Sequence, residues 1–373
     1  MPKSRKPNIE SKKIQVNPSA VRLVQPHNAY LHKTAPDIHC YSLNPYLDDK
    51  STANLSNSCV SFSLMYQPNL NKRALEKLLQ AVIDDDRTIV KKILDLKPEH
   101  LLLEPSDLKI KQIESKKTWQ RFITEKPFVM ALKRNQIEMV KVILPYFDKL
   151  EDGKAEALKQ WQSQEEKQPN FNEMLQPLIN IIARENCANG VMGPLSEETE
   201  AALTTFRETL LPDKAVRLND YFDIEQFLLV ARSAYNANFN TFQTWNQRDV
   251  FCIRLIGFLQ GLVSPELGKI FCEGLYYVLE ENRKISARAE NLKLLGGESF
   301  YRESRLSVVG QGFGFVTAGT GCRADGLALL STRFEKLYRA KAAGLGELKK
   351  RLHVSAQQQG AEPLTSQFHC VIS

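Results

Sequence analysis

Cysteine is scarce and scattered in this 373-residue sequence. The seven cysteines, at positions 40, 59, 187, 252, 272, 322 and 370, are odd in number and form no CxxC pair. This usage is typical of reduced thiols in a cytosol and argues against a disulfide framework. Several potential metal ligands gather near the amino terminus, but their spacings match no known template, so we expect no metal site. These are His27, His32, His39, Cys40 and Cys59.

Histidine is also scarce, and none lies between His100 and His353. The second half of the chain therefore has almost no imidazole to act as a general base. The motifs HExxH and GxSxG and the phosphate-binding P-loop are missing as well. We expect no catalytic residue and no cofactor. One enzymatic alternative stays open, in which residues 171–352 use a carboxylate and a thiol. Its candidates are Glu273 or Asp249 beside Cys252 or Cys272.

Long apolar runs are absent. The longest, from Val250 to Val263, is about 14 residues and contains Arg254 and Gln260, which makes it too short and too polar to span a bilayer. The amino-terminal segment MPKSRKPNIESKK is basic but has no apolar core. We therefore expect neither a transmembrane helix nor a secretory signal peptide.

The charge balance is mildly basic. Fifty Lys and Arg residues against 43 Asp and Glu residues give a net charge of +7, which suits an anionic membrane surface or an acidic partner. Basic stripes with interleaved aromatic residues are missing, and so are RNP-like motifs, so we expect no nucleic-acid partner. With 43% hydrophobic and 25% charged residues, the chain is long enough for two globular domains.

The most informative stretch is residues 126–144, KPFVMALKRNQIEMVKVIL. Pro127 is placed to begin a short helix, and Asn135 falls at a tight turn where asparagine tolerates a left-handed backbone. Apolar residues then return with helical period, which predicts a second, antiparallel helix. The stretch resembles an ankyrin repeat. It departs from the ankyrin consensus at Lys126, Val129, Leu132 and Asn135.

A second copy lies 50 residues earlier, in residues 78–94, LLQAVIDDDRTIVKKIL. Ala81 aligns with Ala131, and Asp85 aligns with Asn135. Since the ankyrin period is about 33 residues, an insertion over residues 104–122 must explain the longer offset. Trp119 and Phe122 within it are expected to cover exposed apolar surface. Ankyrin repeats bind proteins through their turn tips and concave face. We therefore predict a protein-binding surface at Asp84, Asp85, Asp86, Arg134, Asn135 and Gln136.

The predicted fold class is all-α, with ankyrin-like helical hairpin repeats followed by a second α-helical domain. The aromatic residues of its region 220–295 are expected to form a hydrophobic core. Within that region, Ser264 and Pro265 are expected to begin one continuous helix with Leu267, Phe271, Leu275, Val278 and Leu279 on one face. Gly310, Gly312 and Gly314 are assigned to a connecting loop because no GK[ST] follows them. The expected parts are an irregular region 1–70, repeats 71–150, a charged linker 151–170 that begins with a solvated helix, a helical domain 171–295, a glycine-rich loop 296–325, a basic helix 326–353 and a flexible tail 354–373.

The last four residues, Cys370, Val371, Ile372 and Ser373, fit the CaaX prenylation motif, and a terminal serine favours farnesyl. One prenyl chain gives marginal membrane binding, so a second signal is needed. We assign that signal to Lys349, Lys350 and Arg351, on the basic face of the preceding helix. The other cations expected on this face include Lys341.

Degenerate ankyrin copies, an unfamiliar helical domain and this tail together resemble the ankyrin-repeat effectors of Legionella and related intracellular bacteria. The resemblance implies type IV secretion into a host cell, modification by the host farnesyltransferase, attachment to the cytosolic face of a host membrane, and binding to a host protein. A eukaryotic prenylated ankyrin adaptor is the alternative.

Overall fold

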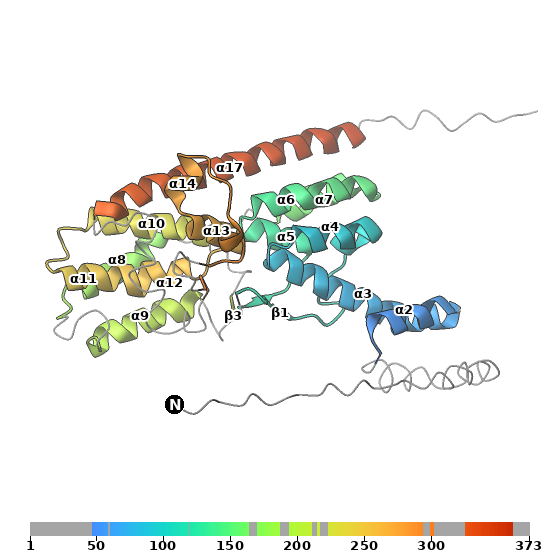
Figure 1. Ribbon diagram of the computed structural model, residues 1–373, viewed down its shortest axis with the longest axis horizontal. Coiled ribbons are helices and arrows are strands. Elements are labelled where there is room, and N and C mark those ends of the chain that lie inside the picture. Colours follow the sequence, from blue (N-terminus) through green and yellow to red (C-terminus); the bar gives the residue numbers. More distant parts are fainter. Residues whose placement is uncertain are drawn as a thin grey trace, which may run out of the picture. The chain divides into compact units, whose positions relative to one another are not determined.

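The computed structural model describes residues 47–58, 60–118, 120–163, 170–186, 194–210, 215–216, 223–293, 299–301 and 325–360. The chain divides into two compact units, residues 1–71 and 72–373, and the site discussed below lies in the second. Most described residues are helical (Figure 1), which confirms the predicted class at that level. Within these residues, no helix combines the length and the apolar character needed to cross a membrane.

The first part of the second unit is a stack of short helices. It comprises the end of α3 (Val60–Ile83), α4 (Arg87–Leu96), α5 (Pro127–Lys133), α6 (Ile137–Ile143), α7 (Gly153–Gln162) and the 3-10 helices η4 (Pro98–Leu101) and η5 (Leu144–Lys149). Pro127 begins α5, as predicted, and α4 packs against α6. We call this part the hairpin layer. Its core holds both Ala81 and Ala131, which are buried.

Two helical hairpins in this layer, α3–α4 and α5–α6, have matching turns. Asp85 and Asn135 both take the left-handed conformation, each with φ of 52°. The residue after each of them donates its backbone N–H to Ala81 O (2.8 Å) or Ala131 O (3.1 Å). The predicted turn at Asn135 is therefore confirmed, and the 50-residue offset describes two turns of one geometry.

The insertion between the hairpins contains strands that an all-α prediction misses. Strands β1 (Gln112–Glu114) and β2 (Arg121–Ile123) pair antiparallel, and β3 (Ala215–Val216) pairs in parallel with β2. Phe122 on β2 is buried in the core of the hairpin layer, as expected for a residue that covers apolar surface. Trp119 lies outside the described residues.

Two segments predicted to be irregular contain helix. In the region 1–70, α2 (Asp49–Ser58) and the first half of α3 are helical, and α3 continues through Pro68. Residues 354–360, assigned to the tail, belong to the final helix. Proline and glutamine do not exclude a helix when one of its faces is packed. The charged segment 151–170 contains the expected helix, α7, but this helix is not fully solvated, because Trp161 packs in the core of the hairpin layer.

The rest of the second unit is an aromatic-rich helical lobe, which we call the second lobe. Its elements are α8 (Phe171–Ile182), α9 (Glu197–Leu210), α10 (Ile224–Ala237), α11 (Trp245–Val250), the π-helix η8 (Phe251–Ile256), α12 (Gly257–Gln260), α13 (Pro265–Glu273), α14 (Leu275–Leu279) and α15 (Ala287–Glu290). Phe227, Phe242, Phe251 and Phe258 lie in one buried core. The aromatic residues therefore do form a core.

The helix predicted to begin at Ser264 is divided in two. Ser264 accepts a hydrogen bond from the backbone N–H of Leu267, and Pro265 occupies the first turn, as predicted. The prediction of one continuous helix is wrong, because Gly274, with φ of 104°, separates α13 from α14. Only glycine takes this conformation without strain, so the chain changes direction there.

The final helix, α17 (Asp325–Gly360), joins both cores (Figure 1). Phe334 and Leu337 pack in the second lobe, whereas Leu352 packs in the hairpin layer. Gly344 lies so close to the hairpin layer that a Cβ at this position would come within 2.5 Å of Ile137 Cδ1. The α17 backbone therefore approaches α6 between its two apolar anchors.

Candidate functional site at the hairpin tips

The six tip residues predicted to bind a partner are mostly inaccessible. Asp84, Asp85, Arg134, Asn135 and Gln136 are buried, and only Asp86 is partly exposed. The prediction of an open surface is therefore wrong for this conformation. Asp85 and Asn135 instead contact, directly or through their neighbours, charged residues of the second lobe and of α17. We call the residues that cover the tips the mask: Glu225, Glu266, Lys269 and Lys341.

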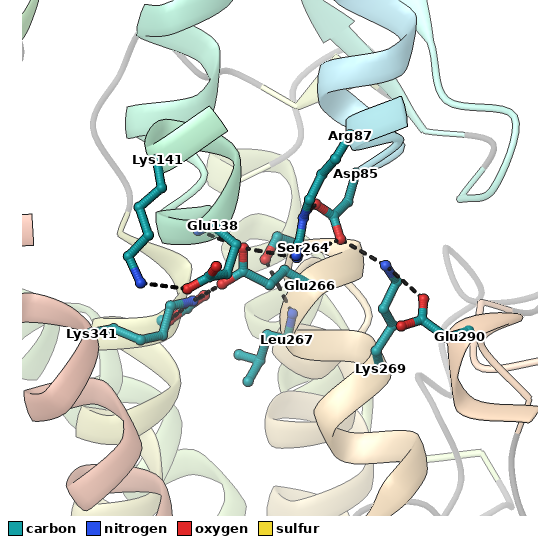
Figure 2. A network of polar contacts seen from close by, with 11 residues as sticks. Asp85, Arg87, Glu138, Lys141, Ser264, Glu266, Leu267, Lys269, Glu290 and Lys341 are labelled. Carbon is teal, nitrogen blue, oxygen red and sulfur yellow. Dashed lines mark hydrogen bonds and ion pairs between the residues drawn. The ribbon is translucent and has the colours of Figure 1, made fainter. Parts of the chain in front are cut away.

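The tip of the first hairpin, which contains Asp85, binds a lysine (Figure 2). Lys269 on α13 places its Nζ 2.7 Å from Asp85 Oδ2 and 3.0 Å from Glu290 Oε2. Arg87, at the start of α4, places its Nε 3.0 Å from Asp85 Oδ1. The Asp85 side chain is fully buried, and both of its oxygens are bound by cations.

The tip of the second hairpin, which contains Asn135, binds a glutamate. Asn135 Nδ2 donates to Glu225 Oε2 on α10 at 2.9 Å. The Glu225 carboxylate also holds Lys341 of α17, whose Nζ lies 2.7 Å from one oxygen and 3.0 Å from the other. Lys341 was expected on the exposed basic face, but it is buried between α10 and α13. Sequence periodicity could not reveal this because Lys341 lies where α17 passes from one core to the other.

Glu266, one turn before Lys269 on α13, links the two halves of the network (Figure 2). Its Oε2 accepts the backbone N–H of Glu138 near the start of α6 at 3.3 Å. Its two oxygens lie 3.7 Å from Lys341 Nζ and 3.9 Å from Arg87 Nη2. Gln136, at the N-cap position before α6, makes no side-chain cap, so the N–H of Glu138 is satisfied from another element.

Burial and charge act against each other in the mask. Burial raises the pKa of Glu225 to about 7, although Lys341 acts to lower it. Burial also opposes the charge on Lys341, but Glu225 and Glu266 outweigh it and raise the pKa of this lysine. The same balance holds for Lys269, where Asp85 and Glu290 overcome burial and raise the pKa. Both lysines are therefore charged at neutral pH.

Asp84, beside the first tip, has a structural role. Its carboxylate accepts hydrogen bonds from the Ser115 hydroxyl and from the backbone N–H groups of Lys116 (3.2 Å) and Lys117 (3.3 Å). Asp86 caps α4 by accepting the backbone N–H of Ile89 at 3.1 Å. These two residues fix the insertion and the helix start, and they leave Asp85 to face the mask.

Arg134 and Gln136, which flank the second tip, are buried with polar atoms that no described group satisfies. The Arg134 guanidinium lies over the Phe122 ring at 4.2 Å, but its Nε and Nη2 have no hydrogen-bond partner. Neither terminal atom of Gln136 has one. Burial lowers the pKa of Arg134 to about 10. The closed contact therefore leaves donors and acceptors unpaired, which is costly.

The residues considered for enzymatic chemistry do not have the properties of activated groups. Cys252 and Cys272 are buried, and burial raises the pKa of both thiols, that of Cys272 to about 12. A nucleophilic cysteine needs the opposite shift. The pKa of Glu273 is lowered because it accepts hydrogen bonds from Ser286, whereas burial raises that of Asp249.

The structure describes only some of the residues that were predicted to bind the membrane. Lys350 and Arg351 are exposed near the end of α17, and Lys349 is half-buried. Arg351 Nε lies 3.1 Å from Glu347 Oε1. Cys370, Val371, Ile372 and Ser373 lie outside the described residues, as do Gly310, Gly312, Gly314 and the amino-terminal histidines. Within the described ranges, no three His, Cys, Asp or Glu side chains are grouped to hold a metal.

The chain matches no protein-family model, and it has no match among curated proteins or solved structures. The ankyrin resemblance therefore depends on the two hairpins alone. The structure adds the mask residues, which the sequence analysis did not connect with the tips. One available signal was the pair Glu266 and Lys269, which are charged residues three positions apart in the largely apolar helix α13.

Proposed function

We propose that this protein is a non-catalytic protein-binding protein that recognises charged helices through its hairpin tips. The observation that carries the proposal is the mask itself. The two tips already receive helical residues of the same chain: Lys269 binds Asp85, and Glu225 binds Asn135. A tip surface that selects both charge signs at fixed positions has the complementarity that gives protein interfaces their specificity.

We further propose that the protein works at an anionic membrane surface. Lys350 and Arg351 project from the last turns of α17, where each cation near an anionic leaflet contributes about 1 kcal/mol. For a chain whose last residue is Ser373, farnesylation of Cys370 would supply the prenyl chain, and these basic residues would supply the second signal that it needs. A host-cell effector of intracellular bacteria and a eukaryotic adaptor both fit this arrangement. Farnesylation by a eukaryotic farnesyltransferase is expected in either case: that of the host cell for an effector and that of its own cell for an adaptor.

Exposed charges beside the tips provide the test of protein binding. Glu138 and Lys141 form an ion pair at 2.6 Å on the rim of the second tip and are about half exposed. Reversing both, as Glu138→Lys with Lys141→Glu, should remove the proteins that the full chain captures from host cytosol, without changing its melting temperature. The control is the reversal Arg184→Glu with Glu198→Lys, which changes an exposed pair on the second lobe. Equal capture by both variants would contradict the proposal.

The membrane proposal has its own test. Flotation with vesicles containing phosphatidylserine should retain the unmodified protein weakly, and Lys350→Glu with Arg351→Glu should abolish this retention. For protein recovered from eukaryotic cells, mass spectrometry should show a farnesyl group on Cys370 and loss of the last three residues. An unmodified Cys370 with all three residues attached would remove the lipidation prediction.

A further inference from the structure

We propose that the mask is detachable, and that the partner which replaces it is an acidic helix carrying one lysine. The inference deepens the proposed function and depends on it for the identity of the partner. The detachment of the mask is tested separately from the binding.

The first observation is that the contact lies between two distinct apolar cores, which α17 joins. The buried residues of the hairpin layer and those of the second lobe form distinct clusters. Between them, the tips and the mask are joined by charged and amide groups. Buried ion pairs gain little net free energy because the desolvation of both charges offsets their attraction. Polar contacts between parts of one chain usually permit relative motion.

The second observation is that the closed contact leaves polar groups unpaired. Arg134 Nε, Arg134 Nη2 and both terminal atoms of Gln136 are buried without partners among the residues that the structure describes. Opening would hydrate all of them, which lowers the free energy of the open form relative to the closed form. Closure therefore depends on the mask residues together with the α17 anchor at Leu352 and the hydrogen bond from Gln120 Nε2 to Gly261 O (3.0 Å). Charge repulsion at Asp85 should open the tips while both cores stay folded.

The chemistry of the mask defines the partner. On α13, Glu266 accepts the Glu138 N–H, and Lys269, three positions later, binds Asp85. Residues three apart lie on one helix face, so a partner helix with the same spacing reproduces both contacts. A partner helix can also make one contact that the mask does not make. The unpaired Nε and Nη2 of Arg134 belong to one edge of the guanidinium, which binds a carboxylate through two hydrogen bonds. A second acidic residue therefore improves the fit.

Detachment is tested by amide hydrogen exchange on the full chain. Lys269→Glu places a carboxylate against Asp85 and should raise exchange in the segment 134–141, whose Glu138 N–H is held by Glu266, at least tenfold. Segments 171–182 and 87–96, one from each core, should keep their protection. The double variant Asp85→Lys with Lys269→Glu restores the ion pair in reverse and should restore protection at 134–141. Unchanged exchange in Lys269→Glu, or loss of protection in all three segments together, would overturn detachment.

The partner is tested with a peptide of residues 262–273 carrying Cys272→Ser. It should bind the Lys269→Glu protein at least tenfold more tightly than the unsubstituted protein. The same peptide with Lys269→Glu should not bind. If exchange shows opening but neither peptide binds, the partner assignment and the tip recognition of the proposed function both fail, and only detachment stands. Equal binding of both peptides would refute the role of Asp85.

Discussion

The two hairpins share a turn but are completed in different ways. In the first, Asp86 caps α4 from within the hairpin, so Asp85 is free to bind a lysine of the mask. In the second, Gln136 makes no cap, and Glu266 of α13 satisfies the helix N–H instead. One tip therefore receives a cation and the other receives carboxylates. This difference allows the second lobe to dock in one register only, since a shifted register would pair like charges.

The largest expected effect comes from Lys341, which joins the second tip to α17. Lys341→Met leaves Glu225 buried without its cation, and the loss of one partner of a buried pair costs about 3 to 5 kcal/mol. Denaturant unfolding measures this loss. Lys336→Met is the matched control on the same helix, because its ion pair with Glu280 is exposed, and it should cost less than about 0.5 kcal/mol. Equal costs would show that Lys341 does not support the second tip.

The next effect concerns the feature that the hairpins share, a small residue in the inner helix. Ala131 is fully buried, and Ala131→Leu should overpack the core and destabilise the protein by about 1 to 3 kcal/mol. Ala81→Leu should behave alike if the two positions are equivalent. Ala201→Leu, on the exposed side of α9, is the control for thermal melts. Loss at only one of the two alanines would break the equivalence of the hairpins.

A smaller effect is the pH dependence of the second tip. Since the pKa of Glu225 is raised to about 7, the folded protein binds a proton that the unfolded chain releases near pH 4.5. The stabilisation is complete below pH 4.5 and is lost as the pH rises through 7, by on the order of 1 kcal/mol per pH unit.

Glu225→Gln should remove this slope. Other carboxylates, such as Glu156, Glu185 and Glu273, have lowered pKa values and give slopes of the opposite sign. The measured quantity is therefore the difference between the unfolding free energies of the two proteins from pH 4.5 to 8. A constant difference would show that Glu225 does not titrate in this range.

The smallest expected effect is that of replacing the turn residues Asp85 and Asn135 by glycine. Asn135→Gly relieves a left-handed asparagine but loses the hydrogen bond to Glu225, and these terms, each about 1 kcal/mol or less, nearly cancel. Asp85→Gly relieves similar strain but leaves Lys269 with Glu290 alone, so it should be the more costly of the two. Melting temperatures in the reverse order would contradict the role of Asp85 in holding Lys269 at the first tip.

The sequence predicted what depends on local chemistry. The turn at Asn135, the cap at Ser264 and the small residues Ala81 and Ala131 follow from backbone and size constraints, which act within a few positions. Burial of the tips could not be predicted in this way. The partners of Asp85 and Asn135 lie 184 and 90 residues away, and no periodic pattern links them.

The burial of Lys341 could not be predicted from the sequence either. Its helical periodicity places it among exposed cations, and only the docking of α17 against α10 and α13 buries it. The helix before Pro68 was not predicted because the Pro, Asn, Ser and Thr content of residues 1–70 favours irregular structure, although α3 continues through Pro68. The break at Gly274 was not predicted because the apolar residues keep their helical spacing across it, although the helix itself ends there.

The position of Leu352 has a consequence for biosynthesis. This side chain completes the core of the hairpin layer, yet it follows α7 by about 190 residues, a delay of roughly 10 to 40 s at ribosomal speeds. During that interval the emerging hairpins present an apolar face that their own chain has not yet covered. Nascent chains of this protein should therefore associate with chaperones until the last helix has been synthesised, and a premature stop before Leu352 should leave a product that is prone to aggregate.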